Sequence, residues 1–213
     1  APDTFRTKSK GRLRYYTFVE VFDFLQDQNA QKTFDDGRAV WEQIDLARGS
    51  ARSMVPHAPY SVSQSLFEKI NAANPSGSTT VSIHNQETPP ENQLFMEGKG
   101  GFVDFYSKFG ISLDKFEATK KSAIFYALSN LNPYNRTLFV HNTLTTRSEI
   151  EAAANWSQQV YWATCPNANL YIENRLPDYS AFLETNARMT IGTDSLTSNW
   201  QLSVLEEMKA IAR

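Results

Sequence analysis

The hydrophobic pattern of the chain repeats a short apolar run followed by a segment with helical spacing. Six runs are rich in β-branched and aromatic residues, which favour β-strands. They cover Leu13–Phe24, Ser53–Pro56, Thr79–His84, Thr137–Val140, Val160–Thr164 and Met189–Ile191. The first run is dense enough in apolar residues to predict a strand that is buried on both faces.

Segments whose apolar residues recur at helical spacing lie between these runs. The expected helices are Asp35–Arg48, a helix capped by Ser63 that ends at 74–77, Ser122–Leu131, Arg147 to about Gln158, Tyr179–Asn186 after a polar loop, and Asn199 to the C-terminus. Residues 1–12 lack such a pattern and are expected to be irregular. Residues 89–117 are expected to form a long loop that serves as a lid or a substrate wall.

The alternation gives six strand-then-helix units in 213 residues, or about 35 residues each, which is the size of a βα unit. Repeated βα units predict an α/β fold in which helices cover a parallel sheet. With 41% hydrophobic residues the chain can bury one sizeable core. We therefore expect a single domain.

Composition argues against several classes of partner. A net charge of −2 and a pI near 6.0 give no reason to expect nucleic acid or an anionic membrane. The basic stretch Arg6–Arg14 is interpreted as a solvated loop rather than a phosphate-binding arm, and no apolar run approaches a membrane span. Cys165 is the single cysteine, which excludes an internal disulfide, and Pro166 follows it without a neighbouring histidine to activate the thiol. These features predict a cytoplasmic protein with a structural cysteine.

All three histidines of the chain stand at the end of a predicted strand. His57, His84 and His141 share this position, and Asp194 follows the last strand. A lone histidine at a strand end is usually an ordinary hydrogen-bonded residue, and a lone aspartate is usually a turn or cap residue. Because the carboxyl ends of parallel strands form one rim, the shared position favours a common site, provided that the sheet curls.

Such a rim could support metal-assisted hydrolysis. Imidazole nitrogens and a carboxylate hold a divalent ion with an open position, and the ion lowers the pKa of bound water to about 7. Glu87 could carry protons between that water and the leaving group, and His141 could polarise the atom under attack. A Ser-His-Asp triad is the competing interpretation, but Ser61 and Ser195 lack the Gly-x-Ser-x-Gly turn that exposes a nucleophile.

Five motifs occur in the order seen in the amidohydrolase superfamily. They are Pro-His-Ala-Pro-Tyr-Ser (56–61), His-Asn-Gln-Glu-Thr (84–88), Val-His-Asn-Thr (140–143), Cys-Pro-Asn-Ala-Asn (165–169) and Gly-Thr-Asp-Ser (192–195). From about residue 50 to its C-terminus the chain resembles the cytosine deaminase-like and chlorohydrolase-like branch. The resemblance implies a (β/α)8 barrel of the TIM type, with one Zn²⁺ or Fe²⁺ at the strand ends.

The resemblance also implies a role for each polar residue of the rim. His84 from the fifth strand and Asp194 from the eighth would be metal ligands, and Asp194 would also be catalytic. Glu87 would be the proton shuttle, His141 would contact the attacking water or the transition state, and His57 would touch the substrate.

Glu20 is unusual because it lies inside the first apolar run. A carboxylate there either pairs with a buried cation or faces a site. We assign it, together with His57, to substrate binding.

One departure from the family pattern is informative. The family supplies two further ligands from a His-x-His motif on its first strand, and this chain has no His-x-His. If His57 follows the fourth strand, Leu13–Phe24 is the third, so the chain holds about six of the eight βα units, strands 3–8. We expect residues 1–213 to be a single partial barrel without strands 1–2 and without the β-sandwich of the family. Alone, it is expected to bind metal weakly or not at all and to show no appreciable turnover.

The leading hypothesis is a metal-dependent hydrolase of C–N bonds, an aminohydrolase of a heterocyclic base or nucleoside-like substrate. Glu91, Phe95 and Gly98-x-Gly100 look similar to deaminases of the aminodeoxyfutalosine type. The alternative hypothesis is a non-catalytic barrel used as a binding or assembly module. The expected partners are a small-molecule substrate and either a second copy of the chain or the N-terminal part of the barrel, because an open parallel sheet leaves unpaired edges.

Overall fold

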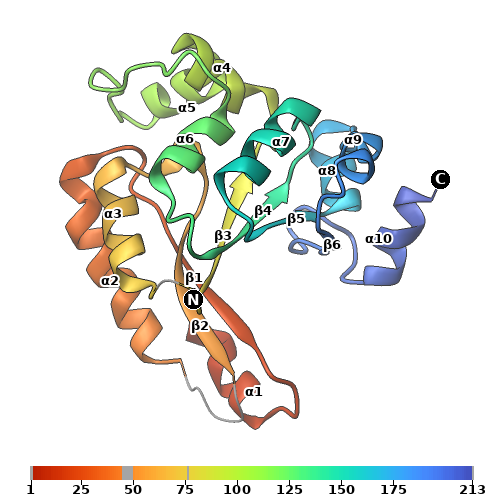
Figure 1. Cartoon of the computed structure of the whole chain (residues 1–213). Coiled ribbons are helices and arrows are strands. Elements are labelled where there is room, and N and C mark those ends of the chain that lie inside the picture. The colour runs from red at the N-terminus through yellow and green to blue at the C-terminus, as the bar shows by residue number, and fades with distance from the viewer. Residues whose placement is uncertain (1, 45–49, 76, 213) are drawn as a thin grey trace.

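Six parallel strands form the framework of the protein in a computed structural model that describes residues 2–44, 50–75 and 77–212 (Figure 1). One sheet consists of β1 (Tyr16–Val21) and β2 (Ala51–Pro56). The other consists of β3 (Thr80–Asn85), β4 (Arg136–His141), β5 (Val160–Thr164) and β6 (Met189–Ile191), in that order. Each strand lies beside the next one in sequence, which is the order of a barrel and not of a doubly wound sheet, where the order reverses.

Hydrogen bonds join the two sheets between β2 and β3. Ser53 Oγ donates to the carbonyl oxygen of Thr80 at 2.7 Å, and the His84 amide donates to the carbonyl oxygen of His57 at 2.9 Å. The second of these bonds holds the carboxyl ends of β2 and β3 together, which is where two of the predicted site histidines lie.

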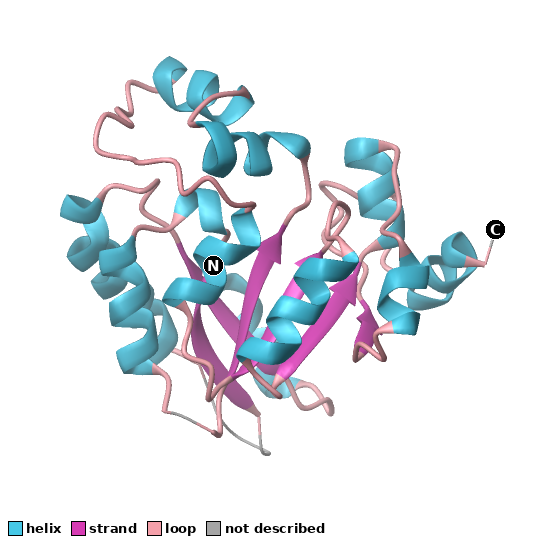
Figure 2. Cartoon of the chain, turned by 45° about the horizontal axis from the view of Figure 1, so that its top comes forward, coloured by secondary structure: helices cyan, strands magenta, loops and turns pink. Residues whose placement is uncertain are grey.

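Helices follow most of the strands and surround the sheets (Figure 2). Figure 1 shows α2 and α3 beside β1 and β2, and α4 with α5 at the end of the sheet to which β3 points. The helices are α1 (Phe5–Lys10), α2 (Ala30–Glu42), α3 (Gln64–Ala73), α4 (Pro89–Glu97), α5 (Gly101–Lys108), α6 (Ala123–Asn130), α7 (Arg147–Trp156), α8 (Pro166–Glu173), α9 (Tyr179–Glu184) and α10 (Val204–Ile211). Among the described residues, no helix has the length and apolar character needed to cross a membrane.

The main core lies between the strands and their covering helices. Alternate residues of β3, Val81 and Ile83, are buried in it. Phe139 of β4 stacks on Trp162 of β5, with ring centroids 5.1 Å apart. The intervening residues of β3, including His84, point to the other face and are only partly buried. One face of the sheet therefore stabilises the fold and leaves the other for polar groups.

The α/β class with parallel strands and outer helices is confirmed, and β5 and β6 have the predicted bounds. The Ser63 cap is also confirmed, because Ser63 Oγ accepts the Leu66 amide. The first strand is shorter than Leu13–Phe24 and is not buried on both faces. In β1, Thr17, Val19 and Val21 are buried, whereas the opposite face carries the exposed Tyr16 and Glu20. Aromatic density alone did not reveal that this face is open.

The prediction of a long loop over residues 89–117 is wrong, because α4 and α5 lie there. Thr88 and Glu91 form a capping box at the start of α4, and Pro89 and Pro90 occupy its first turn. Gly98 (φ 68°) ends α4 in the left-handed conformation, and Gly100 (φ 99°) precedes α5. These glycines make the turn between two helices, so they are not a phosphate loop.

Other helix boundaries also differ from the prediction. The first predicted helix starts at Ala30 instead of Asp35, and residues 45–48 of that prediction lie outside the described residues. The last helix starts at Val204 instead of Asn199. Two further helices, α1 and α8, lie where irregular structure and a polar loop were expected. α1 buries none of its residues, so the hydrophobic pattern carries no signal for it.

Candidate active site

The three histidines lie in one row at the carboxyl ends of β2, β3 and β4. The ring centroids of His57 and His84 are 4.9 Å apart, and those of His84 and His141 are 5.4 Å apart. The sheet therefore curls enough to bring together residues that lie 84 positions apart in the sequence, from His57 to His141.

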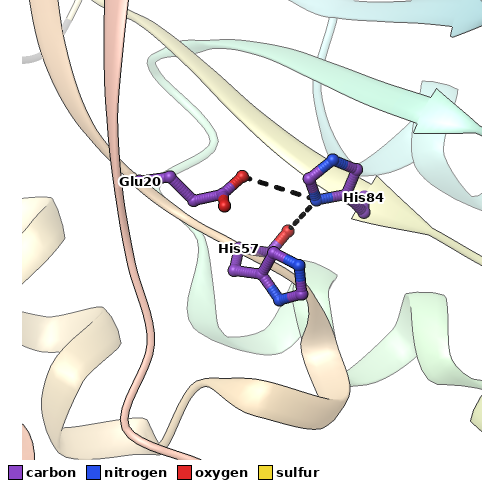
Figure 3. Close-up of side chains that lie close together, drawn as sticks. All are labelled: Glu20, His57 and His84. Atoms are coloured by element: carbon purple, nitrogen blue, oxygen red, sulfur yellow. Dashed lines mark hydrogen bonds and ion pairs between the residues drawn. The ribbon is translucent and has the colours of Figure 1, made fainter. Parts of the chain in front are cut away.

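Glu20, His57 and His84 form the first of two groups whose possible ligand atoms lie within 4.8 Å of one another. His84 Nδ1 is 2.8 Å from the carbonyl oxygen of His57 and 3.6 Å from Glu20 Oε2 (Figure 3). Figure 3 shows the Glu20 side chain reaching from β1 toward the His84 ring. Of the two alternatives left open for Glu20, the structure places it at the candidate site, beside a histidine.

The second group consists of Glu87, His141 and Asp194, again within 4.8 Å. Glu87 Oε1 is 3.4 Å from His141 Nε2. Glu87 is also close enough to His84 and Asp194 for both charges to act on its pKa. The two residues implied as metal ligands, His84 and Asp194, thus fall into different groups, with Glu87 close to both.

Each histidine uses its Nδ1 proton in a hydrogen bond to an oxygen. His84 donates to the carbonyl oxygen of His57, and His141 donates to Asn169 Oδ1 at 3.0 Å. His57 Nδ1 lies 2.7 Å from Ser61 Oγ, which itself donates to the carbonyl oxygen of Ala58 and so accepts the histidine proton. In a neutral ring held in this way the lone pair is on Nε2, which is the state required of a metal ligand or a proton acceptor.

Burial favours the neutral forms of His57, His141 and Glu87. Together with the neighbouring histidines, burial lowers the pKa of His57 to about 3, and burial with His84 lowers that of His141 to about 4. Burial raises the pKa of Glu87 to about 7, although His84 acts in the opposite direction. A carboxyl group that titrates near neutral pH beside an unprotonated imidazole is suited to moving a proton.

Three turns at this rim contain residues other than glycine in the left-handed conformation. They are Gln86 (φ 46°), His141 (φ 72°) and Asp194 (φ 56°). Such a conformation costs about 1 kcal/mol or more per residue and persists only where the surroundings enforce it. These three residues lie where β3, β4 and β6 present the polar residues of the rim.

The Amidohydrolase family model matches residues 13–213. The chain belongs to the amidohydrolase family. Its sequence is 27% identical over 158 residues to the adenosine deaminase of Helicobacter pylori, covering 74% of this chain and 38% of that protein. It is 30% identical over 155 residues to the aminodeoxyfutalosine deaminase of Nitratiruptor sp., covering 72% of this chain and 36% of that protein. The chain thus spans less than half the length of these curated relatives.

Solved amidohydrolase structures share the fold. The aminofutalosine deaminase of Helicobacter pylori in complex with methylthio-coformycin superposes with a TM-score of 0.79 at 20% identity, over 99% of this chain and 51% of that one. An adenosine deaminase from Xanthomonas campestris with bound zinc has a TM-score of 0.65 at 20% identity, over 99% of this chain and 44% of that one. The predicted barrel fold is confirmed, and the described strands form part of such a barrel.

Sequence reasoning missed the residues that orient the amidohydrolase histidines. Asn169 fixes the ring of His141, and Ser61 fixes the ring of His57. Asn169 is the last residue of the Cys-Pro-Asn-Ala-Asn motif, but the motif alone did not indicate this role. Tyr60 also contacts this site, because its ring meets that of His57 edge-on at 5.7 Å and stacks on Phe102 at 3.9 Å. The available signal was the cluster of small polar residues directly after strands, which have little reason to be buried unless they hold another group.

The competing nucleophiles are unsuited to attack. Ser61 is 1% exposed, and its oxygen accepts the His57 proton instead of giving its own proton to the ring. Ser195 lies in the turn after β6, where its amide donates to Asp194 Oδ1. Cys165 is buried, and burial raises the pKa of its thiol to about 12, as the structural interpretation requires.

The neutral state of His141 leads to a pH prediction. Its pKa is about 4 in the folded chain and about 6.5 in the unfolded chain, so the unfolded state binds more protons between these values. This histidine therefore lowers stability as pH falls through that window, by about 2 kcal/mol between pH 7 and 4.5. Urea unfolding at both pH values should show that the free energy of unfolding falls less for His141→Gln than for the unchanged chain. The NMR signals of the His141 imidazole should titrate near pH 4. Titration near pH 6.5 would contradict the lowered pKa of His141.

Proposed function

We propose that the chain is part of a metal-dependent aminohydrolase that removes an amino group from a heterocyclic base or a nucleoside-like compound. The observation that carries the proposal is the row of three histidines beside Glu87 and Asp194. The named activities of the relatives support the substrate class, because they include an adenosine deaminase and an aminodeoxyfutalosine deaminase.

The donor set fits a divalent ion. His84 offers its Nε2 atom and Asp194 offers a carboxylate oxygen, which together match the preference of Zn²⁺ for nitrogen and oxygen ligands. These two residues would hold Zn²⁺, or Fe²⁺, and the zinc-bound adenosine deaminase with the same fold supports zinc. When bound, the ion would make water available as a nucleophile at neutral pH.

Glu87 is proposed to carry the protons of the reaction. It takes a proton from the attacking water as the water oxygen bonds to the ring carbon. It then returns a proton to the amino nitrogen as the C–N bond breaks, so that ammonia leaves. A pKa near 7 suits both directions of transfer, because the group is neither too weak a base nor too weak an acid.

The remaining residues are proposed to orient water and substrate. His141, fixed by Asn169, accepts a hydrogen bond from the attacking water through Nε2. His57 and Glu20 contact the substrate on the opposite side of His84. Glu20 is 41% exposed at its side chain, so it is accessible to a bound molecule.

Residues 1–213 are proposed to form a partial barrel domain of a cytoplasmic enzyme. The curated relatives are more than twice as long as the segments that match, which supports a larger parent protein. The first two strands of the barrel and the β-sandwich would lie in the rest of that protein. A second copy or this remainder would cover the open edges of β1 and β6, which lie at the ends of the two sheets.

The proposed function is tested by measuring ammonia release by the whole protein. Adenosine, 5′-deoxyadenosine, aminodeoxyfutalosine and guanine form the substrate set, because each carries an exocyclic amino group on a purine ring. We expect hydrolysis of at least one of them, loss of activity on treatment with a chelator and recovery with zinc. The 213-residue chain alone is expected to give no appreciable turnover. Substrate binding without any turnover in the metal-loaded whole protein would instead favour the non-catalytic binding module.

A further inference from the structure

The turn between β3 and α4 carries Glu87, and a single buried carboxyl group holds it. Glu91 Oε2 accepts the amide of Gln86 at 2.9 Å, and Glu91 Oε1 accepts the amides of Glu87 at 2.7 Å and Thr88 at 3.1 Å. Glu91 is 0% exposed, and no ion pair to it occurs among the described residues. Its side-chain oxygens accept hydrogen bonds from the backbone of this turn.

These contacts exceed what a helix cap requires. The glutamate of an ordinary capping box accepts one backbone amide, that of the N-cap residue. The chain has such a box at α7, where Glu149 Oε2 accepts the Thr146 amide at 2.7 Å. Glu91 does the same for Thr88, but it also binds the amides of the two preceding residues. The additional bonds fall on Glu87 and on the residue before it.

The turn needs this support because its first residue is strained. Gln86 is in the left-handed conformation, which L-residues other than asparagine and aspartate rarely adopt. Its side chain is fixed separately, since Gln86 Nε2 donates to Glu149 at 2.9 Å and Gln86 Oε1 accepts from Thr145 at 2.7 Å. With the side chain anchored on one side and the amide on the other, the direction in which the chain enters Glu87 is determined.

We propose that Glu91 is a positioning residue, whose carboxyl group fixes the backbone of residues 86–88 and thereby keeps the Glu87 side chain at His141. The proposal rests on the proposed role of Glu87 as proton carrier. It gives Glu91 a function beyond capping α4, namely the alignment of the acid–base group with the histidine 3.4 Å away.

The test uses Glu91→Gln in the 213-residue chain, because glutamine keeps the size but replaces one accepting oxygen by an NH₂ donor that faces backbone N–H groups. Hydrogen exchange of the amides of residues 86–88 is expected to accelerate at least tenfold, and the ¹⁵N signal of His141 Nε2 is expected to shift. Asp178→Asn is the matched control. Asp178 caps α9 by accepting the amides of Ser180 at 3.1 Å and Ala181 at 3.4 Å, away from the turn. It should leave both readouts unchanged.

Two results would overturn the proposal. One is unchanged exchange at residues 86–88 with faster exchange confined to α4, which is what a simple cap would show. The other is an unmoved His141 signal despite a loosened turn. If Glu91→Gln fails to fold, Glu91→Asp decides, since its shorter side chain keeps the carboxylate but cannot reach all three amides.

A kinetic measurement separates this proposal from the proposed function. In the whole protein, Glu91→Gln should lower kcat at least tenfold with KM changed less than about twofold, because alignment acts on the chemical step. If the unchanged whole protein deaminates none of the substrates, the proposed function fails while the exchange result still stands. If it is active and Glu91→Gln retains full kcat, the positioning role fails alone.

Discussion

Replacing Glu87 by glutamine in the whole protein is expected to lower kcat for deamination by about 10²–10⁴-fold. Glutamine preserves the shape of the side chain but can neither take up the proton of water nor return one to the leaving amine. Because Glu87 is only 15% exposed, bulk water cannot easily substitute for it. The measurement is steady-state ammonia release, with KM expected to change much less than kcat.

Glu97→Gln is the matched control for this variant. Glu97 ends α4, the helix that follows the Glu87 turn, and its side chain is 47% exposed in a surface ion pair with Lys99. The same chemical change there should alter kcat by less than about twofold, because a solvated surface pair contributes little. Equal kcat in Glu87→Gln and the unchanged protein would contradict the proton-carrier role.

Replacing Trp162 by alanine is expected to destabilise the chain by about 3–5 kcal/mol. Trp162 is 2% exposed in β5, which lies between β4 and β6, and its ring centroid is 5.1 Å from that of Phe139 and 5.4 Å from that of Phe182. Removing the indole leaves a large cavity between the sheet and α9 that these rings cannot fill by small shifts. Urea unfolding at constant pH measures the change.

Tyr134→Ala provides the comparison for a loss of aromatic surface without a cavity. Tyr134 is 72% exposed, so its removal should change the free energy of unfolding by less than about 0.5 kcal/mol. If Trp162→Ala lost no more than this control, the packing between β4, β5 and α9 would not be the support that the structure indicates.

The strands were predicted more accurately than the helices that do not pack on the sheet. β5 and β6 have the predicted bounds because β-branched and aromatic runs between turn residues are a local signal. α4 and α5 were missed because their apolar residues, including Leu94, Phe95 and Phe102, pack in a small separate cluster instead of on the sheet. The capping sequence Thr-Pro-Pro-Glu at 88–91 was the available signal, and it outweighs weak periodicity.

The polar residues of the rim could be predicted as a set, but their pairing could not. Strand-end position and the family motifs both pointed to His57, His84, His141 and Asp194. The orientation of the His84 and His141 rings depends on the His57 carbonyl group and on Asn169, which come from other βα units than the histidines that they bind. Likewise, the position of Glu20 beside His84 depends on how far the sheet curls between β1 and β3.

By itself the sequence determined the α/β class, the order of the βα units, the residues of the rim and the membership of the amidohydrolase family. Each of these depends on residues close together in the chain or on their order along it. Only the tertiary structure decided the lowered pKa values of His57 and His141, the pKa of Glu87 near 7 and the three backbone amides that Glu91 accepts. These properties arise from burial and from hydrogen bonds made across turns and between strands, and both exist only once the parallel strands curl and bring their ends together.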